Sequence, residues 1–122
     1  MILLDTNIFT YLANGTISPN VVAKKDIYFT SICKIEALGY SNITVVEQSY
    51  LEQLFDECYQ IDLDEQIIKR AITLRLQKKM SLGDAIVAAA AIESGCVLWT
   101  ANIENFDDID ELKTFNPLKK DK

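Results

Sequence analysis

The chain has 122 residues, of which 49% are hydrophobic, and it carries a formal net charge of −6. This length suits one domain with its own core, and the acidic balance disfavours binding of nucleic acid through bulk charge. The sequence contains no histidine, which excludes Ser-His-Asp triads, Cys-His pairs and zinc sites built on histidine.

The predicted elements alternate between strands and helices. In chain order we expect a strand at 2–4, a helix at 7–13, a strand at 26–31, helices at 34–40 and 44–58, a strand at 60–63, helices at 64–79 and 81–94, a strand at 96–100 and an edge strand at 114–115. This alternation predicts a parallel sheet covered on both faces. In such α/β folds ligands gather at the carboxyl ends of the strands.

Two local patterns support these bounds. Thr44 and Glu47 form a capping box at the start of the helix at 44–58, and Gly95 follows the last residue of the helix at 81–94. The helix at 44–58 has apolar positions at helical spacing, namely Val46, Tyr50, Leu54 and Cys58. They suffice for a core-facing side and for part of an interface, and the sequence does not separate these two uses.

The cysteines and the apolar runs indicate the compartment. Cys33, Cys58 and Cys96 are isolated in apolar surroundings without Cys-x-x-Cys spacing, so we expect buried free thiols in a reducing environment. The N-terminal apolar run lacks the basic region of a signal peptide, and the run at 85–92 is too short to span a bilayer. We therefore expect a cytoplasmic protein with no membrane partner.

Three acidic residues lie among apolar residues, where an ionised carboxylate is normally unfavourable. Asp5 follows the first predicted strand, Glu36 lies within the helix at 34–40, and Asp84 falls in the first turn of the helix at 81–94. An open α/β sheet can bring such positions to one edge. Together they predict a carboxylate cluster that holds a divalent metal.

Each acid also has a purely structural interpretation. Asp5 fits the N-cap of the following helix, and Asp84 fits a capping box with Ser81 at the favourable end of the helix dipole. Glu36 fits an exposed position, since Glu is mostly found at the surface. The joint pattern outweighs these separate interpretations, because all three acids fall where the sheet edge would gather them.

Four segments in series carry a family resemblance. They are Leu3–Asn7, the segment from Glu36 to Tyr40, the helical run 84–90 and the segment from Thr100 to Phe106. Together they resemble a PIN domain, most closely the VapC-like ribonuclease toxins of prokaryotic toxin–antitoxin pairs. Any one segment is weakly specific, whereas the four in series, spread over residues 1 to about 117, are a strong pattern.

The resemblance implies a three-layer α/β/α fold with a central parallel sheet of four to five strands, as one domain over residues 1–118. It also implies Mg²⁺- or Mn²⁺-dependent endoribonuclease activity, with Asp5, Glu36 and Asp84 at the metal-site positions. From their chemistry, Asp5 and Asp84 would ligate the metal, and Glu36 would act through a water or orient the nucleophile. Three neighbouring carboxylates also predict a raised pKa for at least one of them.

Asn102 departs from the family pattern, because many PIN domains carry Asp after the last central strand. Its amide oxygen can still ligate a metal or hold a water, so we expect Asn102 to complete the catalytic set. Asn105 likewise stands where related sequences have an acid. These departures leave open whether the site holds one metal or two.

Substrate and partner residues follow less directly. Thr6 and Asn7 are candidates for binding the scissile phosphate, and Lys78 and Lys79 for positioning RNA, although a basic helix is more often a solvated face. Tyr11 is a candidate for stacking on a base, whereas Phe9 and Trp99 fit core positions better. The resemblance further implies an RNA substrate, a small antitoxin protein and a homodimer. Residues 119–122 form a basic tail that we expect to be disordered.

Three other functions compete with this prediction. Asn102 favours a catalytically inactive PIN-like module that binds RNA or protein without cutting. A phosphatase of the haloacid dehalogenase type would have Asp-x-Asp after the first strand, where this chain has Asp5-Thr6-Asn7. A response-regulator receiver would have an Asp ending its third strand and a Lys ending its fifth, and neither pattern is met.

Overall fold

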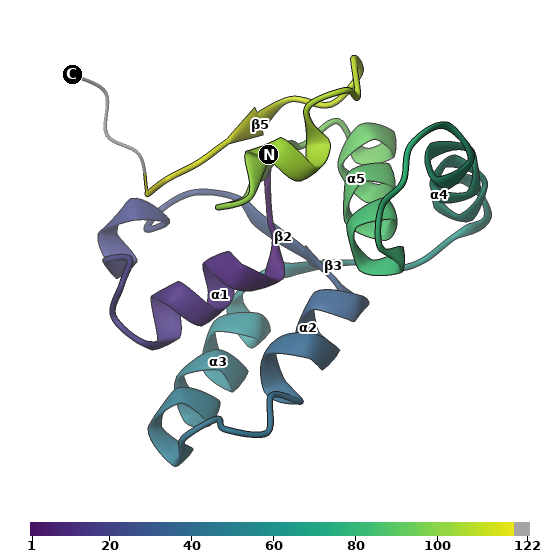
Figure 1. The fold of residues 1–122 in the computed structure, drawn as a ribbon. Helices are drawn as coiled ribbons and strands as arrows, with labels where there is room; N and C mark the ends of the chain where they lie inside the picture. Colours follow the sequence, from purple (N-terminus) through teal and green to yellow (C-terminus); the bar gives the residue numbers. More distant parts are fainter. Residues whose placement is uncertain (119–122) are drawn as a thin grey trace.

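The computed structural model describes residues 1–118 and has three layers, with helices on both faces of a central sheet (Figure 1). The predicted basic tail at 119–122 lies outside the described residues. The strands are β1 Ile2–Leu4, β2 Ile27–Thr30, β3 Tyr59–Ile61, β4 Val97–Trp99 and β5 Thr114–Phe115. The α-helices are α1 Thr6–Ala13, α2 Ser31–Leu38, α3 Val45–Glu57, α4 Glu65–Gln77 and α5 Leu82–Ser94. Two 3₁₀ helices, η1 Pro19–Val21 and η2 Ile103–Phe106, complete the described part.

The sheet is parallel throughout the described residues, with the strand order β3-β2-β1-β4-β5. The central strand β1 pairs with β2 on one side and with β4 on the other, and Leu4 is in register with Trp99. The carboxyl ends of β1 and β4 therefore lie side by side. This confirms the predicted α/β class and puts the residues after both strands at one edge.

Alternate residues of the three central strands, β2, β1 and β4, pack into the two opposite layers. Leu3 and Leu98 pack with α4 and α5 in one apolar cluster, whereas Leu4 and Trp99 pack with α1, α2 and α3 in the other. Figure 1 shows the same division, with α4 and α5 on one side of β1 and β2 and α1 and α3 on the other. Strands that are buried on both faces explain the short, unbroken apolar runs in the sequence.

Side chains from neighbouring residues fix the helix ends. Thr44 and Glu47 form the predicted capping box of α3, and Asp64 accepts a hydrogen bond from the backbone of α4. Gly95 ends α5 in the left-handed conformation (φ 70°), which glycine adopts without steric cost. Most bounds lie within two residues of expectation, and the largest difference is at α2. This helix begins at Ser31 rather than at residue 34, because the hydroxyl of Thr30 caps it directly after β2.

The structure shows which apolar positions on α3 face the core. Leu51 and Phe55 form the buried face, while Tyr50, Leu54 and Cys58 are partly buried at its margin. Val46 is 76% exposed, because it lies in the first turn, beyond the residues that the core covers. The stripe that the sequence predicts is therefore one helical position away from the true core face.

The three cysteines are free, as predicted. Cys33 and Cys96 are buried, whereas Cys58 is only partly buried. Burial raises the pKa of the Cys58 thiol to about 11, so it stays protonated at neutral pH. Within residues 1–118, no helix combines the length and the apolar composition that crossing a membrane requires.

Candidate active site

Asp5 lies at the carboxyl end of β1 and is the N-cap of α1. Its Oδ1 atom accepts a hydrogen bond of 2.8 Å from the backbone N–H of Thr6. Its Oδ2 atom accepts one of 2.9 Å from the hydroxyl of Thr100. Only 8% of Asp5 is exposed. The predicted cap and the predicted site residue are therefore the same side chain, because a strand-to-helix turn puts the N-cap at the sheet edge.

Thr100 connects the two strand ends. It is fully buried directly after β4, and its hydroxyl donates to Asp5 while accepting a hydrogen bond of 3.1 Å from the backbone N–H of Asn102. Asn7 adds a second link between α1 and the segment after β4, since its Oδ1 accepts a hydrogen bond of 3.5 Å from the backbone N–H of Ala101. The segment after β4 is thereby held against the carboxylate of Asp5.

Glu36 enters from α2, on the side of its helix that faces α1 and α5. Its Oε1 accepts a hydrogen bond of 2.6 Å from the hydroxyl of Thr6. Its Oε2 lies 3.3 Å from the position that a Cβ atom would take at Gly83. The residue is exposed to solvent, as the structural interpretation of a mid-helix Glu predicted, yet it borders the same hollow as Asp5.

Asp84 lies in the first turn of α5. Its backbone N–H donates a hydrogen bond of 3.1 Å to the hydroxyl of Ser81, which is the N-cap. This is half of the predicted capping box, since among the described residues the backbone N–H of Ser81 donates no hydrogen bond to the carboxylate of Asp84. The carboxylate therefore borders the hollow without accepting a hydrogen bond from the backbone of its own helix end.

One hollow of about 400 Å³ collects these side chains. Its lining residues come from the segments after β1 and β4, the first two turns of α1, the start of α5 and, with Glu36, α2. They are Asp5, Thr6, Asn7, Thr10, Tyr11, Glu36, Ser81, Gly83, Asp84 and Asn102. All four predicted catalytic residues thus share one hollow. Most of the lining residues have polar side chains; three of them are carboxylates, and none of the described lining residues is a lysine or an arginine.

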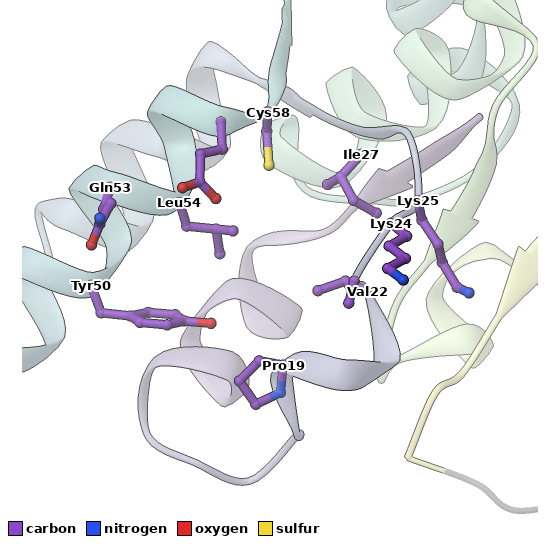
Figure 2. A pocket seen from close by; sticks show the side chains of 11 residues that line it. Pro19, Val22, Lys24, Lys25, Ile27, Tyr50, Gln53, Leu54 and Cys58 are labelled. Carbon is purple, nitrogen blue, oxygen red and sulfur yellow. The ribbon is translucent and has the colours of Figure 1, made fainter.

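A second hollow, of about 540 Å³, lies between α3 and the segment before β2 (Figure 2). Cys58, Ile27 and Val22 point into it, and Tyr50, Lys24 and Lys25 lie around it in the view of Figure 2. Although it is larger, it holds only one carboxylate, from Glu57, and a thiol with a raised pKa. The acidic hollow is therefore the better candidate for chemistry.

The electrostatics of the acidic hollow agree with a cluster of like charges. Burial raises the pKa of Asp5, the hydrogen bonds from Thr100 and Thr6 lower it, and repulsion from Asp84 and Glu36 raises it further. Burial also raises the pKa of Asp84, against a hydrogen bond with Ser81, and repulsion from Glu36 adds to the increase. The pKa of both aspartates is raised, in the expected direction, but burial contributes more than the repulsion on which the expectation rested.

Comparison with known proteins identifies the family. The family model of the PIN domain matches residues 2–112. The chain belongs to the PIN domain family. PIN domains are generally nucleases. No curated protein matches the chain.

Solved structures support the identification of this PIN domain. VapBC-1 from nontypeable Haemophilus influenzae is 26% identical with a TM-score of 0.77, and the match covers 98% of this chain and 100% of that one. VapBC2 from Rickettsia felis, bound to a DNA fragment from the promoter, is 25% identical with a TM-score of 0.80, over 95% and 98% of the two chains. A toxin–antitoxin complex from Klebsiella pneumoniae has a TM-score of 0.80 at 22% identity, over 96% and 98%, and shows the shared fold.

The donor set of this PIN domain fits a hard divalent cation. Three carboxylates, the amide of Asn102 and the hydroxyl of Thr6 offer oxygen alone, which Mg²⁺ and Mn²⁺ prefer. Yet within residues 1–118 no three acidic or cysteine side chains converge closely enough to form a finished cation site. Mutual repulsion and the Thr6 hydrogen bond favour this separation. The residue types fit the metal, but the described side chains do not form a complete set of ligands for it.

The structure does not bring Lys78 and Lys79 into the hollow. Lys78 lies 3.7 Å from Asp108 and borders a different surface near Arg70, and Lys79 is exposed beyond the end of α4. Arg70 itself is bound to Glu93 and Glu111. Contact between these two lysines and a substrate stays a prediction, and the ion pairs favour the solvated-face interpretation.

Sequence reasoning missed three contributors to the site. Thr100 was part of the family pattern, but its role as the partner of Asp5 had no sequence signal apart from its position after a buried strand. Ser81 was recognised only as a cap, and Gly83 had no assigned role. Thr100 and Gly83 act through contacts between elements far apart in the chain, whereas Ser81 acts within the first turn of α5.

Gly83→Ala is expected to lower nuclease activity without loss of stability. The added Cβ would lie 3.3 Å from Glu36 Oε2, so the carboxylate must move by a few tenths of an ångström. Small misplacements of reacting groups are costly, and we expect activity to fall by roughly an order of magnitude. Stability should hold or rise by up to about 1 kcal/mol, because Ala is a better helix former than Gly.

The check compares cleavage rates and urea unfolding of Gly83→Ala with those of Ser94→Ala, a control at the far end of α5. The control should keep full activity. Full activity in Gly83→Ala would mean that the position of the Glu36 carboxylate does not matter for the reaction.

Proposed function

We propose that this PIN domain is a Mg²⁺- or Mn²⁺-dependent endoribonuclease and the toxin of a toxin–antitoxin pair. One observation carries the proposal: Asp5, Glu36 and Asp84, which come from three separate segments, border a single hollow at the carboxyl ends of the strands. The family supports nuclease activity in general, and the similar VapBC structures support the toxin role. RNA as substrate and the metal requirement are inferences from the site and the resemblance.

Each residue of the site would have its own role in the reaction. Asp5 and Asp84 hold the cation, and Glu36, fixed by the hydroxyl of Thr6, orients the attacking water. A bound Mg²⁺ or Mn²⁺ supplies a water of lowered pKa and positive charge beside the phosphate. Asn7 offers amide N–H groups to the phosphate oxygens, and the amide oxygen of Asn102 would hold the cation or a water at the same edge. Thr100 keeps Asp5 in position by its buried hydrogen bond.

The acidic hollow and the similar solved structures also support a protein partner. A small antitoxin protein that covers the acidic hollow with a basic side chain would neutralise its carboxylates. The complexes in the similar solved structures support such a partner. The homodimer expected from the resemblance is part of this proposal, and the cytoplasmic location stays a prediction.

The test is a cleavage assay on the purified full chain, with labelled RNA in Mg²⁺, Mn²⁺ or EDTA. We expect cleavage only with metal, and a loss of ~100-fold or more in Asp84→Asn, because even residues behind the metal ligands cost about 10–100-fold. Glu52→Gln, an exposed change on α3, is the matched control and should cleave like the wild type. Cleavage that persists in EDTA would contradict the metal mechanism.

Asn102 favours a second candidate, an inactive module that binds RNA or protein. An amide carries no charge, so it holds a cation more weakly than a carboxylate would. If folded wild-type protein is stabilised by Mn²⁺ but cleaves no RNA from a varied set, this candidate replaces the nuclease. Restoring activity with Asn102→Asp would then identify the cause.

A further inference from the structure

We propose that Asn116 is a positioning residue of the acidic hollow, which fixes the peptide group before Asn102 and thereby holds the Asn102 amide in place for the cation. The inference rests on the proposed function and adds to it a residue that follows the last strand. Asn116 is outside the lining of the hollow, directly after β5, and only 8% of it is exposed. A buried amide of this kind needs hydrogen-bond partners, and they show what it does.

The local sequence fixes the side chain of Asn116. Its Oδ1 accepts a hydrogen bond of 2.9 Å from the backbone N–H of Leu118, which is the pattern of an Asx turn. Pro117 lies between them and favours an extended backbone at the residue before it. Because only the oxygen of an amide can accept this bond, the NH₂ group points the other way, and it donates a hydrogen bond of 3.4 Å to the carbonyl of Ala101.

The bond to Ala101 reaches the segment that carries Asn102. The backbone N–H of Thr100 donates a hydrogen bond of 3.0 Å to the carbonyl of Phe115, at the end of the pairing between β4 and β5. One residue further on, the side chain of Asn116 makes the contact between the two segments. The turn after β5 therefore braces the strand end that borders the hollow.

The peptide group between Ala101 and Asn102 is bound on both sides. Its carbonyl accepts the hydrogen bond from Asn116, and its N–H donates one of 3.1 Å to the hydroxyl of Thr100. The carbonyl of Asn102 in turn accepts a hydrogen bond of 3.0 Å from the N–H of Asn105. The side chain of Asn102 does not cap η2, which it precedes, and it borders the hollow. The fixed main chain therefore decides where this amide lies.

The lack of charge on Asn102 explains why its position needs support. A carboxylate attracts a cation over a distance, whereas a neutral amide contributes when its oxygen is at bonding distance. Residues that orient the groups around a metal typically contribute about 10- to 100-fold to metal affinity or activity. We expect Asn116 to contribute at the lower end of this range, because it acts through one peptide group.

The first measurement is the Mn²⁺ affinity of the purified full chain by titration calorimetry, which requires no cleavage. Asn116→Ala should weaken Mn²⁺ binding by about 10-fold. Asn42→Ala is the matched control and should bind like the wild type. Asn42 is an exposed asparagine after α2 whose side chain makes a hydrogen bond of 3.5 Å with Tyr40, outside the lining of the hollow.

A double-mutant cycle distinguishes positioning from a general effect on the fold. If Asn116 acts through Asn102, the variant with both Asn102→Ala and Asn116→Ala should bind Mn²⁺ as weakly as Asn102→Ala alone, within about twofold. Losses that multiply would show that Asn116 acts elsewhere and would overturn the proposal. So would unchanged Mn²⁺ affinity of folded Asn116→Ala with a lower urea midpoint, because Asn116 would then contribute to stability alone.

A second variant keeps the turn and removes the donor. Asn116→Asp can still accept the hydrogen bond from Leu118, but its carboxylate cannot donate to Ala101. It should lose Mn²⁺ affinity as Asn116→Ala does, measured at high salt, which screens the added charge. Wild-type affinity under these conditions would mean that the donated bond does not matter, and the proposal would be wrong.

Cleavage of RNA by the same samples separates this inference from the proposed function. If the wild type binds Mn²⁺ without cleaving and the cycle gives the expected result, the nuclease is wrong and the positioning role stands. If the wild type cleaves but Asn116→Ala binds Mn²⁺ equally well, the positioning role is wrong and the nuclease stands. Folded wild-type protein that binds no Mn²⁺ overturns both.

Discussion

Asp5→Asn is expected to abolish metal-dependent cleavage and, at neutral pH without metal, to raise the melting temperature. The loss of activity, ~100-fold or more, follows from removing the most buried carboxylate of the hollow. Removing the same carboxylate should also stabilise the fold, because burial and two neighbouring carboxylates disfavour the charge of Asp5. Asn keeps the cap of α1, because it also accepts a hydrogen bond at an N-cap.

The sign of the pH dependence follows from the raised pKa of Asp5. Between the unfolded pKa of about 3.9 and the higher folded pKa, the folded protein holds a proton that the unfolded chain has lost. The free energy of unfolding therefore falls as pH rises through this window, and the deficit persists above it. The advantage of Asp5→Asn should be full at pH 7 and vanish as pH falls below about 4.

Thermal unfolding from pH 4 to 8, in EDTA and with Mg²⁺ or Mn²⁺, checks this expectation. The cation should stabilise the wild type by about 2.7 kcal/mol at 100 times its dissociation constant, and Asp5→Asn much less. Asp110→Asn, an exposed change outside the hollow, is the control. A lower melting temperature of Asp5→Asn in EDTA at pH 7 would show that the hydrogen bonds of the carboxylate outweigh the burial of its charge.

Phe9→Ala is expected to cost about 3–5 kcal/mol of folding free energy. Phe9 is fully buried, and its ring lies 4.5 Å from that of Phe55 and 6.2 Å from that of Phe29, centroid to centroid. These three rings join α1, β2 and α3, so truncation leaves a cavity at the point where the layers meet. Because small domains have only about 5–15 kcal/mol in total, this loss would leave the protein close to unfolding.

Urea unfolding measures this loss, and Val46→Ala is its control. Val46 is 76% exposed on α3, so its truncation should change stability by no more than about 0.5 kcal/mol. A loss below 1 kcal/mol in Phe9→Ala would mean that the ring cluster is loosely packed. A large loss in Val46→Ala would reveal that this side chain is covered in solution.

Much of the fold was predictable, because its determinants are local. Apolar runs bounded by turns and caps predict the four longer strands and all five helices, and the capping box of Thr44 predicts the start of α3. The errors lie at bounds and faces: the start of α2 depends on Thr30, and the buried side of α3 depends on Phe9 and Phe29 from other elements. A helix pattern alone does not reveal how far the neighbouring layer extends along it.

The sequence by itself determined the class of chemistry. The chain has no histidine, and the acids predicted for the site offer carboxylate oxygens. Because residue types decide which atoms can bind a metal, the sequence already predicts a site of oxygen ligands. Only the tertiary structure decided how those acids are held. The hydroxyls of Thr6 and Thr100 reach Glu36 and Asp5 across 30 and 95 residues of chain, and the ring of Tyr11 borders the hollow while that of Phe9 does not. Such contacts depend on distances between packed layers, and the spacing of residues along one segment does not specify them.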